Sequence, residues 1–556
     1  MPHGVAAVAR ASITLVRRQA GAESCTLARR DFYRELPAAY TAQLMIELDG
    51  QSLDLGVFRR VVMGQPAAPA GEGSVHCRLA PAAAERVAAA REMVARVVAS
   101  GVATYGINTG FGDLATVRID PGRTGELQRR LLLSHAAGVD RPLPPEVVRG
   151  MLLLRANTLA SGYSGARVEL VELLLALLSR DLLPVVPRRG SVGASGDLAP
   201  LAHLALPLIG EGEVMVDGRQ LPAAQALATA GLEALTLEAK EGLALINGTQ
   251  AMTAVTAVAA LEMRRLVQSA DLIGALTTEA LRGTDSAFDA RLNARRPHPG
   301  QQLSAANLWQ LLQDSAIRES HRENDIRVQD PYSIRCMPQV HGAVRDVLTD
   351  VERRLEIEMN AVTDNPLIFV EDELIISGGN FHGEPIAMAA DFLTIAAAEL
   401  GAISERRIEK LTNGAHSGLP PFLVADAGLN SGFMIAQVTA AALASENKTL
   451  AHPASVDSLP TSADKEDHVS MGMGAALKLR RTVMNTRQVL AIELLAAAQG
   501  IDLLRPLASS EQLERLHARV REQVAAWTED RYMAPDLAAA EQLLAGGLDD
   551  LLDALV

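Results

Sequence analysis

Between residues 251 and 510 the chain is a succession of long segments whose apolar residues recur with the period of an α-helix. One of these segments has a thick apolar face formed by Val489, Leu490, Ile492, Leu494 and Leu495. Ala and Leu dominate, aromatic residues make up only 3%, and strand-like blocks of Val, Ile, Thr and Tyr are scarce. Such long helices bury their apolar faces against one another or against other subunits, so we expect a mainly all-α bundle within an oligomer.

The sequence divides into four segments. Residues 1–44 carry six arginines and few acids, without an apolar core long enough for a secretory signal. We expect there a disordered extension or a start codon placed too early, with initiation at Met45; a transit-like segment is the other reading. Residues 45–250 should form a smaller mixed domain, 251–510 the long-helix bundle, and 511–556 C-terminal helices that pack on the bundle. The last segment repeats the apolar spacing at Leu513, Leu516, Val520, Val524 and Trp527.

Charge and apolar runs narrow the possible partners. The 52 basic and 66 acidic residues give a net charge of −14 without a basic stripe, so nucleic acids and anionic membranes are poor partners. Two long uncharged stretches, 243–261 and 427–445, are mixed with small and polar residues. We expect helices buried on all sides within the bundle rather than membrane spans.

Cysteine and histidine usage points to a reducing, metal-free setting. Cys25, Cys77 and Cys336 are widely spaced and form no C-x-x-C pair, so neither a disulfide framework nor a zinc site is predicted. The twelve histidines include no pair at helical metal-binding spacing. The sequence therefore requires no metal and suits a cytoplasmic location.

The run G-S-V-G-A-S-G-D-L-A-P-L-A-H, residues 190–203, carries unusual chemistry. At Ala194-Ser195-Gly196 the backbone is unhindered enough for an amide nitrogen to attack the carbonyl two residues back. Loss of water from the ring and of the Ser195 hydroxyl would then leave an electron-poor methylidene carbon. A plain turn before a helix is the commoner reading of such a tripeptide in isolation. A phosphate loop is excluded because no Lys follows Gly196, and a nucleophile elbow because Asp197 replaces the required Gly.

The fourteen-residue run resembles the signature of the aromatic amino acid ammonia-lyases, whose Ala-Ser-Gly becomes 4-methylideneimidazol-5-one (MIO). Seven further segments from about Met45 onward resemble, in the same order, the histidine ammonia-lyases of that family. They are T-Y-G-I-N-T-G-F-G, L-S-H-A-A-G-V, L-I-N-G-T-Q, V-Q-D-P-Y-S-I-R-C-M-P-Q-V-H-G, T-D-N-P-L, G-G-N-F-H-G-E-P and S-E-N-K-T-L-A-H-P-A-S-V-D-S-L-P-T-S-A-D-K-E-D-H-V-S.

The resemblance implies a helical homotetramer in which each active site draws on three subunits. It implies that MIO forms autocatalytically from Ala194, Ser195 and Gly196 with help from Asp197, and that no dissociable cofactor is needed. Carried over by position, the remaining site would comprise Tyr105, His135, Asn247, Gln329, Tyr332, Arg335, Phe381 and Glu466.

The resemblance also implies roles. Tyr105 would act in proton transfer, Arg335 would bind the substrate carboxylate, and Asn247, Gln329 and Tyr332 would orient the substrate or the prosthetic group. Local sequence alone favours a packed tyrosine and a surface arginine, and leaves Asn247 open as core structure. A helix beginning near Asp197 would present its positive end to the modified tripeptide.

The pair Ser134-His135 resembles the pair found at this position in the histidine lyases. Phenylalanine lyases have a pair like Phe-Leu there, and tyrosine lyases have a pair like His-Leu. Polar groups here suit an imidazole, which both donates and accepts hydrogen bonds. Met434 and Glu466 match the same pattern, and Glu466 can pair with an imidazole nitrogen or act as base. Lys465 departs from the Gln often found in the family, and we expect it to face solvent.

The expected reaction is therefore non-oxidative deamination of L-histidine to trans-urocanate and ammonia, the first step of histidine degradation. An MIO aminomutase and a catalytically inactive helical scaffold are the alternatives.

Overall fold

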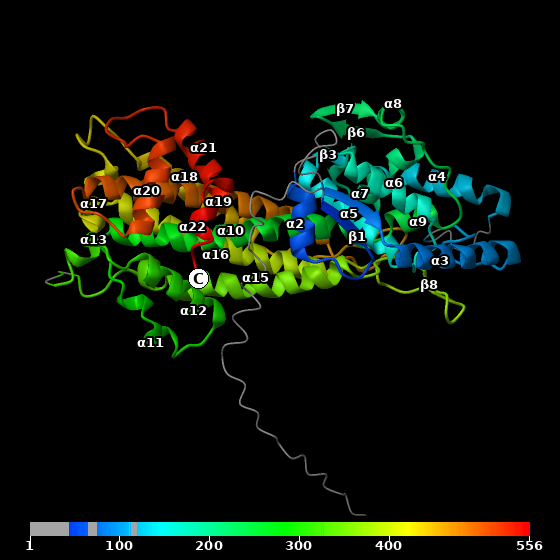
Figure 1. Cartoon of the computed structure of the whole chain (residues 1–556), viewed down its shortest axis with the longest axis horizontal. Coiled ribbons are helices and arrows are strands. Elements are labelled where there is room, and N and C mark those ends of the chain that lie inside the picture. The colour runs from blue at the N-terminus through cyan, green and yellow to red at the C-terminus, as the bar shows by residue number, and fades with distance from the viewer. Residues whose placement is uncertain (1–43, 65–74, 111, 113–118, 324, 326) are drawn as a thin grey trace, which may run out of the picture. The chain divides into compact units, whose positions relative to one another are not determined.

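The computed structural model describes residues 44–64, 75–110, 112, 119–323, 325 and 327–556. The predicted extension, residues 1–44, lies outside the described residues except for Leu44. Within the described part the chain is mainly helical with a few short strands (Figure 1), which confirms the predicted fold class.

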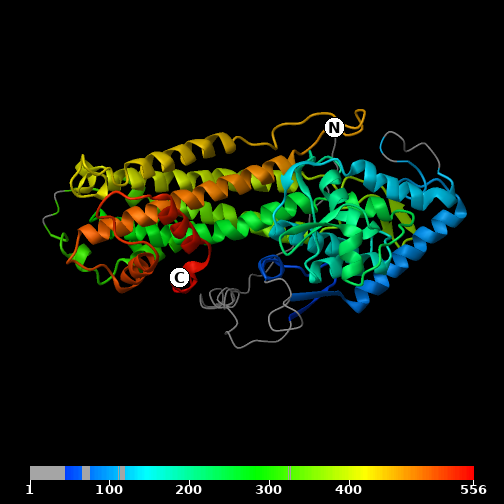
Figure 2. The same ribbon diagram turned by 90° about the horizontal axis from the view of Figure 1, so that it is seen from above.

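Three long helices form the centre of the bundle: α10 (Gln250–Ala280), α16 (Glu384–Thr412) and α19 (Gly472–Leu503). They pack along one another for most of their length (Figure 2). The five apolar residues singled out on α19 are all buried, at most 2% exposed. Burial of such faces against one another is the main source of helix stability in a bundle.

Two further long helices run in the opposite direction. Near the end of α15 (Met337–Met359), Glu358 accepts a hydrogen bond from Thr249 at the start of α10. Near the end of α18 (Met434–Leu450), Asn447 accepts one from Asn485 in the first half of α19. α10, α16 and α19 are thus parallel to one another and antiparallel to α15 and α18.

A buried polar network ties the bundle together in the second half of α10, α16 and α19, near the start of α15. Arg407 of α16 donates two hydrogen bonds to Glu493 of α19 at 2.5 and 2.8 Å, and both side chains are fully buried. Arg407 also contacts His341 of α15, whose other ring nitrogen lies 2.8 Å from Asp271 of α10. Because buried charges must find their partners, this network sets how the four helices align along their axes.

A smaller mixed region precedes the bundle. Its helices are α2 (Leu55–Met63), α3 (Pro81–Ser100), α4 (Thr124–His135), α5 (Pro145–Ala160), α6 (Val168–Ser179), α7 (Leu198–Ala205), α8 (Ala223–Thr229) and α9 (Glu241–Ile246). Its strands pair as β1 (Leu44–Leu48) with β2 (Val75–Leu79) in parallel, β3 (Val139–Pro142) with β5 (Pro187–Arg189) antiparallel, and β4 (Leu183–Pro184), β6 (Glu213–Val216) and β7 (Arg219–Pro222) in one antiparallel sheet.

The rest of the chain consists of short elements at the edges of the bundle. The hairpin β8 (Leu367–Phe369) and β9 (Leu374–Ile376) follows α15. The short helices are α11 (Ala290–Asn293), α12 (Pro299–Leu311), α13 (Ala316–Glu319), α14 (Tyr332–Arg335), α17 (Gly414–Ser417), α20 (Glu511–Gln523), α21 (Ala534–Gln542) and α22 (Asp549–Leu552). The expected divisions at 250 and 510 fall where α10 and α20 begin, but both parts share one core, and the domain division stays a prediction.

The two uncharged stretches behave differently. Residues 243–261 form α9 and the start of α10 and are almost entirely buried, as expected. The expectation of burial on all sides is wrong for 427–445: α18 begins only at Met434, and Ile435 and Val438 are 64% and 52% exposed. α18 lies at the edge of the bundle, so one of its faces packs on α16 and α19 and the other faces outward.

Among the described residues, one helix is long and apolar enough to cross a membrane, namely α16. Most of that stretch is buried inside the bundle.

Candidate active site

The tripeptide lies in a tight loop between β5 and α7. Gly193 and Gly196 both have positive φ, +69° and +72°, which a side chain makes costly. A Cβ at Gly196 would lie 2.2 Å from the carbonyl oxygen of Gly248. The same oxygen accepts a 2.7 Å hydrogen bond from the amide of Asp197. The loop therefore lies directly against the turn at the start of α10, with no room for any residue but glycine.

Two polar side chains hold Ser195. Asn247, 4% exposed, donates to the Ser195 carbonyl oxygen at 2.8 Å. The Ser195 hydroxyl donates to Glu466 at 2.6 Å. Residues from α9 and from the loop before α19 thus meet at the predicted reactive residue, 52 and 271 positions away in sequence.

Asp197 is buried beneath the tripeptide. Its carboxylate accepts hydrogen bonds from Ser191 at 2.7 Å and from the amide of Met252 at 2.8 Å. Burial, only partly offset by these bonds, raises the pKa of Asp197 to about 6. A carboxyl group with this pKa can take up and release a proton near neutral pH, next to the residues expected to cyclise.

Glu466 lies on a tight loop that returns on itself. Thr461 and Ser462 donate to its second carboxylate oxygen at 2.6 and 2.9 Å. Burial acts to raise the pKa of Glu466, but the hydrogen bonds from Ser195, Thr461 and Ser462 outweigh it and hold that pKa below its usual value. Lys465 is exposed, as expected. The site therefore contains an ionised carboxylate at neutral pH.

His135 and Ser134 end α4 close to this carboxylate. The ring of His135 contacts the Leu131 carbonyl oxygen at 2.9 Å and the Ser134 hydroxyl at 3.0 Å. Burial lowers the pKa of His135, while the Leu131 carbonyl and the charge of Glu466 act in the opposite direction. The imidazole is therefore neutral at neutral pH, with Glu466 within electrostatic range.

The long helices begin at this loop. The amide of Met252, in the first turn of α10, donates a hydrogen bond to the Asp197 carboxylate. The amide of Gly383, just before α16, donates to the Gly193 carbonyl oxygen. The amide of Met471, just before α19, donates to the Val192 carbonyl oxygen. α7 starts directly after Asp197, as hypothesised. Helix N-termini carry a partial positive charge, so their convergence favours electron density arriving at the tripeptide.

Tyr105 and Phe381 lie on loops that reach the same region. A Cβ at Gly106 would press on Leu243 of α9 at 2.7 Å, so the Tyr105 loop packs on the helix that leads to Asn247. Phe381 stands two residues before Gly383 and is half-buried. Among the described residues, no hydrogen bond joins Tyr105 or Phe381 to the tripeptide.

The other predicted site residues lie at the far end of the bundle. Thr284, just after α10, donates its amide to Asp330 at 2.6 Å, which places the Gln329–Arg335 segment at the end of α10. The 31 residues of α10 rise by about 1.5 Å each, so the segment is about 45 Å from the tripeptide of the same chain.

Met434 is similarly distant. Its neighbour Phe433 packs on Trp527, whose carbonyl oxygen accepts a bond from Gln499 near the end of α19. Since α19 begins at the tripeptide loop and Gln499 lies 27 residues further on (472 to 499), Met434 is about 40 Å away. One chain therefore brings together Ser134, His135, residues 194–197, Asn247 and Glu466, but not Gln329, Tyr332, Arg335 or Met434.

Sequence reasoning missed the residues that support this site. Arg155, fully buried, donates to the Asn247 carbonyl oxygen at 3.1 Å and to Gln250 at 2.9 Å. Lys240 and Asp364 form a fully buried ion pair beneath the same region, at 2.9 Å. The only available signals were charged residues within apolar helical stretches and the motif T-D-N-P-L, whose Asp364 was not singled out.

Known proteins resemble this chain over most of its length. The sequence profile described as aromatic amino acid lyase matches residues 67–522. Histidine ammonia-lyases of Stigmatella aurantiaca and Anaeromyxobacter sp. (strain K) are each 54% identical, covering 92% and 90% of this chain and 98% and 99% of theirs.

Solved structures agree with the sequence relatives. Histidine ammonia-lyase from Trypanosoma cruzi has a TM-score of 0.84 at 44% identity, covering 92% of this chain and 96% of that one. Tyrosine aminomutase from Streptomyces globisporus has a TM-score of 0.84 at 38% identity, with 92% and 98% covered. The chain belongs to the aromatic amino acid lyase family.

Proposed function

We propose that the chain catalyses the non-oxidative deamination of L-histidine to trans-urocanate and ammonia, the entry to histidine degradation. The observation that carries the proposal is the set of polar groups from Ser134, His135 and Glu466 beside Ser195. An imidazole ring satisfies such donors and acceptors, whereas a hydrocarbon ring would leave them unpaired. The histidine ammonia-lyases at 54% identity support the same substrate.

The residues around the tripeptide fit an autocatalytic MIO group. Glycine is required at 196, Asn247 polarises the Ser195 carbonyl, and Asp197 can exchange a proton during the loss of two waters. Once formed, MIO supplies an electrophilic methylidene carbon that makes the amine a better leaving group. The proposal needs no metal and no dissociable cofactor.

Two side chains are available for moving the β-proton. Tyr105 lies on the loop that packs against α9, and Glu466 is ionised at neutral pH. Glu466→Gln keeps a hydrogen-bond acceptor but cannot accept a proton. If the variant loses only kcat, Glu466 transfers the proton. If the loss is mainly a higher KM, Glu466 binds the imidazole and Tyr105 transfers the proton.

We further propose that the working site is assembled in a homotetramer. Arg335 and Tyr332 lie about 45 Å from their own tripeptide, so they can serve only the tripeptide of another copy. The outward apolar face of α18 around Ile435 and Val438 supports contact between copies. Unpaired Cys77 and Cys336 fit a cytoplasmic location.

Mixing two inactive variants tests the shared site. Ser195→Ala removes the tripeptide chemistry and Arg335→Met removes the carboxylate ligand. Refolded together, the two should regain a fraction of wild-type activity, because some sites combine an intact tripeptide with an intact Arg335. No activity in the mixture, with tetramers formed, would contradict a site shared between chains.

Incubation of purified protein with L-histidine tests the reaction itself. A lyase releases ammonia and a conjugated, ultraviolet-absorbing acrylate, whereas an aminomutase yields a β-amino acid. An inactive scaffold gives neither product, and intact-mass spectrometry then finds no loss of two waters at residues 194–196.

A further inference from the structure

The segment that carries Tyr332 and Arg335 combines exposed side chains with three buried residues, namely Asp330, Ser333 and Ile334. Tyr332 is 70% exposed, whereas Asp330, two positions earlier, is only 6% exposed. Asp330 is thus the buried carboxylate that anchors the start of this segment, while Ile334 packs its middle against the bundle.

Asp330 uses both its side chain and its backbone. Its carboxylate accepts the amide hydrogen of Thr284 at 2.6 Å, which ties the segment to the turn after α10. Its backbone carbonyl oxygen accepts a 3.0 Å hydrogen bond from Nε of Arg335. A single residue thus links the end of a 31-residue core helix to the guanidinium.

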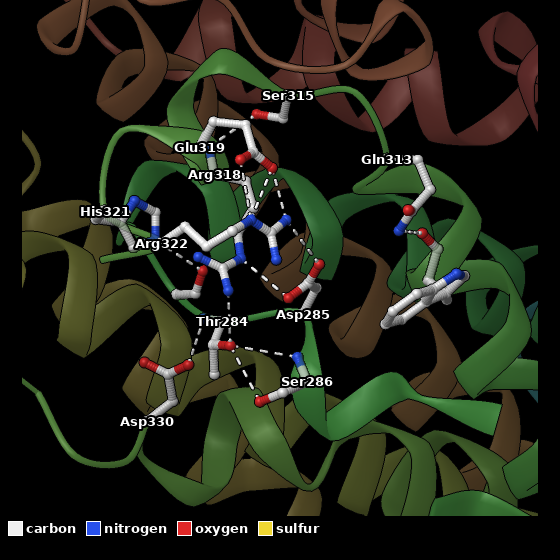
Figure 3. A network of polar contacts seen from close by, with 12 residues as sticks. Thr284, Asp285, Ser286, Gln313, Ser315, Arg318, Glu319, His321, Arg322 and Asp330 are labelled. Carbon is white, nitrogen blue, oxygen red and sulfur yellow. Dashed lines mark hydrogen bonds and ion pairs between the residues drawn. The ribbon is translucent and has the colours of Figure 1, made fainter. Parts of the chain in front are cut away.

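The turn that holds Asp330 is itself braced from behind. Figure 3 shows Thr284 between Asp330 on one side and Arg318 on the other. Arg318 donates to the Thr284 hydroxyl at 3.2 Å and to the Asp285 carboxylate at 3.0 Å. The Arg318 and Asp285 side chains are 9% and 7% exposed, and the Arg318 backbone amide donates to the capping hydroxyl of Ser315 at 3.1 Å. A buried ion pair with this much support holds the turn in one position.

The consequence falls on Arg335. Its Nε is used by Asp330, and its guanidinium stacks over the Tyr332 ring at 4.3 Å. Within the described part of the chain, its two terminal nitrogens have no hydrogen-bond partner. A guanidinium held in this way presents two parallel N–H groups, the geometry that a carboxylate accepts.

We propose that Asp330, supported by the Thr284–Arg318–Asp285 contacts, is a positioning residue that orients Arg335 for the carboxylate of an amino acid bound at another subunit's tripeptide. The inference rests on the proposed function and adds the residues that hold the substrate-binding arginine in place.

Asp330→Ala in the full-length protein tests the assignment, with Asp350→Ala on the exposed face of α15 as the matched control. The expected result is a rise of about 10- to 100-fold in the KM for L-histidine, with a smaller fall in kcat. The Ki of 3-(imidazol-4-yl)propionate, which has the carboxylate, should rise equally, while that of histamine, which lacks it, should stay within about twofold. The loss of two waters at the tripeptide should be complete in both variants.

Two further variants keep the test decisive if Asp330→Ala does not fold. Asp330→Asn retains an oxygen that can accept from Thr284 and should restore most of the affinity for the carboxylate ligand. Arg318→Met should weaken that ligand selectively, whereas Arg291→Met, at a side chain that is 91% exposed and pairs with Asp289, should not.

Three results would overturn the assignment: unchanged KM and Ki values in Asp330→Ala, equal weakening of histamine and the propionate, or Asp330→Asn as damaging as Ala. Failure of the proposed function looks different, because wild-type protein would then release no urocanate from L-histidine.

Discussion

The two ends of the long bundle are built in opposite ways. At the end where α10, α16 and α19 begin, the reactive loop is enclosed: Asn247 is 4% exposed and Asp197 fully buried. At the end where they finish, Tyr332 projects with 70% of its surface exposed. Under the proposed function, the first end holds the groups that are kept from water, and the second holds the groups that reach another copy of the chain.

The largest effect is expected from a substitution that removes the chemistry of the enclosed end. Ser195→Ala abolishes the electrophile and should lower kcat for L-histidine by at least about 10⁴-fold, because the prosthetic group acts as a unit with its supports. Its mass should show no loss of water, while the distal residues stay in place. Full activity in this variant would contradict the whole mechanism.

The next-largest effect is expected from a substitution in the buried polar network that joins the long helices. Arg407→Ala leaves the Glu493 carboxyl group buried without its guanidinium partner, so we expect a loss of about 3–5 kcal/mol in the free energy of unfolding. Urea unfolding at a fixed chain concentration measures it. Arg481→Ala, which removes an ion pair with Glu446 whose two side chains are 49% and 42% exposed, is the control and should change stability by less than about 1 kcal/mol. Equal losses in both variants would show that the buried network does not set the alignment of the bundle.

A smaller effect is expected at His135, which tests how the enclosed end recognises the imidazole ring. His135→Leu removes a polar partner for the imidazole and should lower kcat/KM for L-histidine by about 10- to 100-fold. His135→Gln keeps a donor and an acceptor and should lose less. If Leu and Gln behave alike, hydrogen bonding at this position does not select the ring.

The smallest effect concerns pH. Because the folded-state pKa of His135 lies below 6.5, the folded chain binds fewer protons there than the unfolded chain. Stability from this group is therefore present above pH 6.5 and is lost as pH falls through the window down to the lowered pKa. Wild type should lose more unfolding free energy than His135→Gln between pH 7.5 and pH 5. An identical loss in both would remove His135 as the cause.

Local patterns predicted the helices and the enclosed end well. For α3 (Pro81–Ser100), the Pro at the first turn is a local signal that a helix begins there. Prolines mark two more helix starts in the same way: Pro331 precedes α14, and Pro338 lies in the first turn of α15. Val524 and Trp527 are buried as the spacing predicted, although α20 ends at Gln523.

What could not be predicted depends on contacts between distant residues. Thr284 and Asp330 are 46 positions apart, and Ser195 and Glu466 are 271 apart. No periodicity reports such pairs. The separation of Arg335 from its own tripeptide also follows only from the direction of α10, which motif order along the sequence does not reveal.

The hydrogen bond from Ser195 to Glu466 has a consequence for newly made protein. The hydroxyl that occupies the carboxylate is the same one that must depart when the ring forms. Under the proposed mechanism, a freshly folded chain lacks the electrophile and has its Glu466 carboxylate engaged, and departure of the Ser195 hydroxyl as one of the two lost waters ends both conditions. The Glu466 oxygen that Ser195 occupies would then become available to substrate only as the proposed prosthetic group is completed.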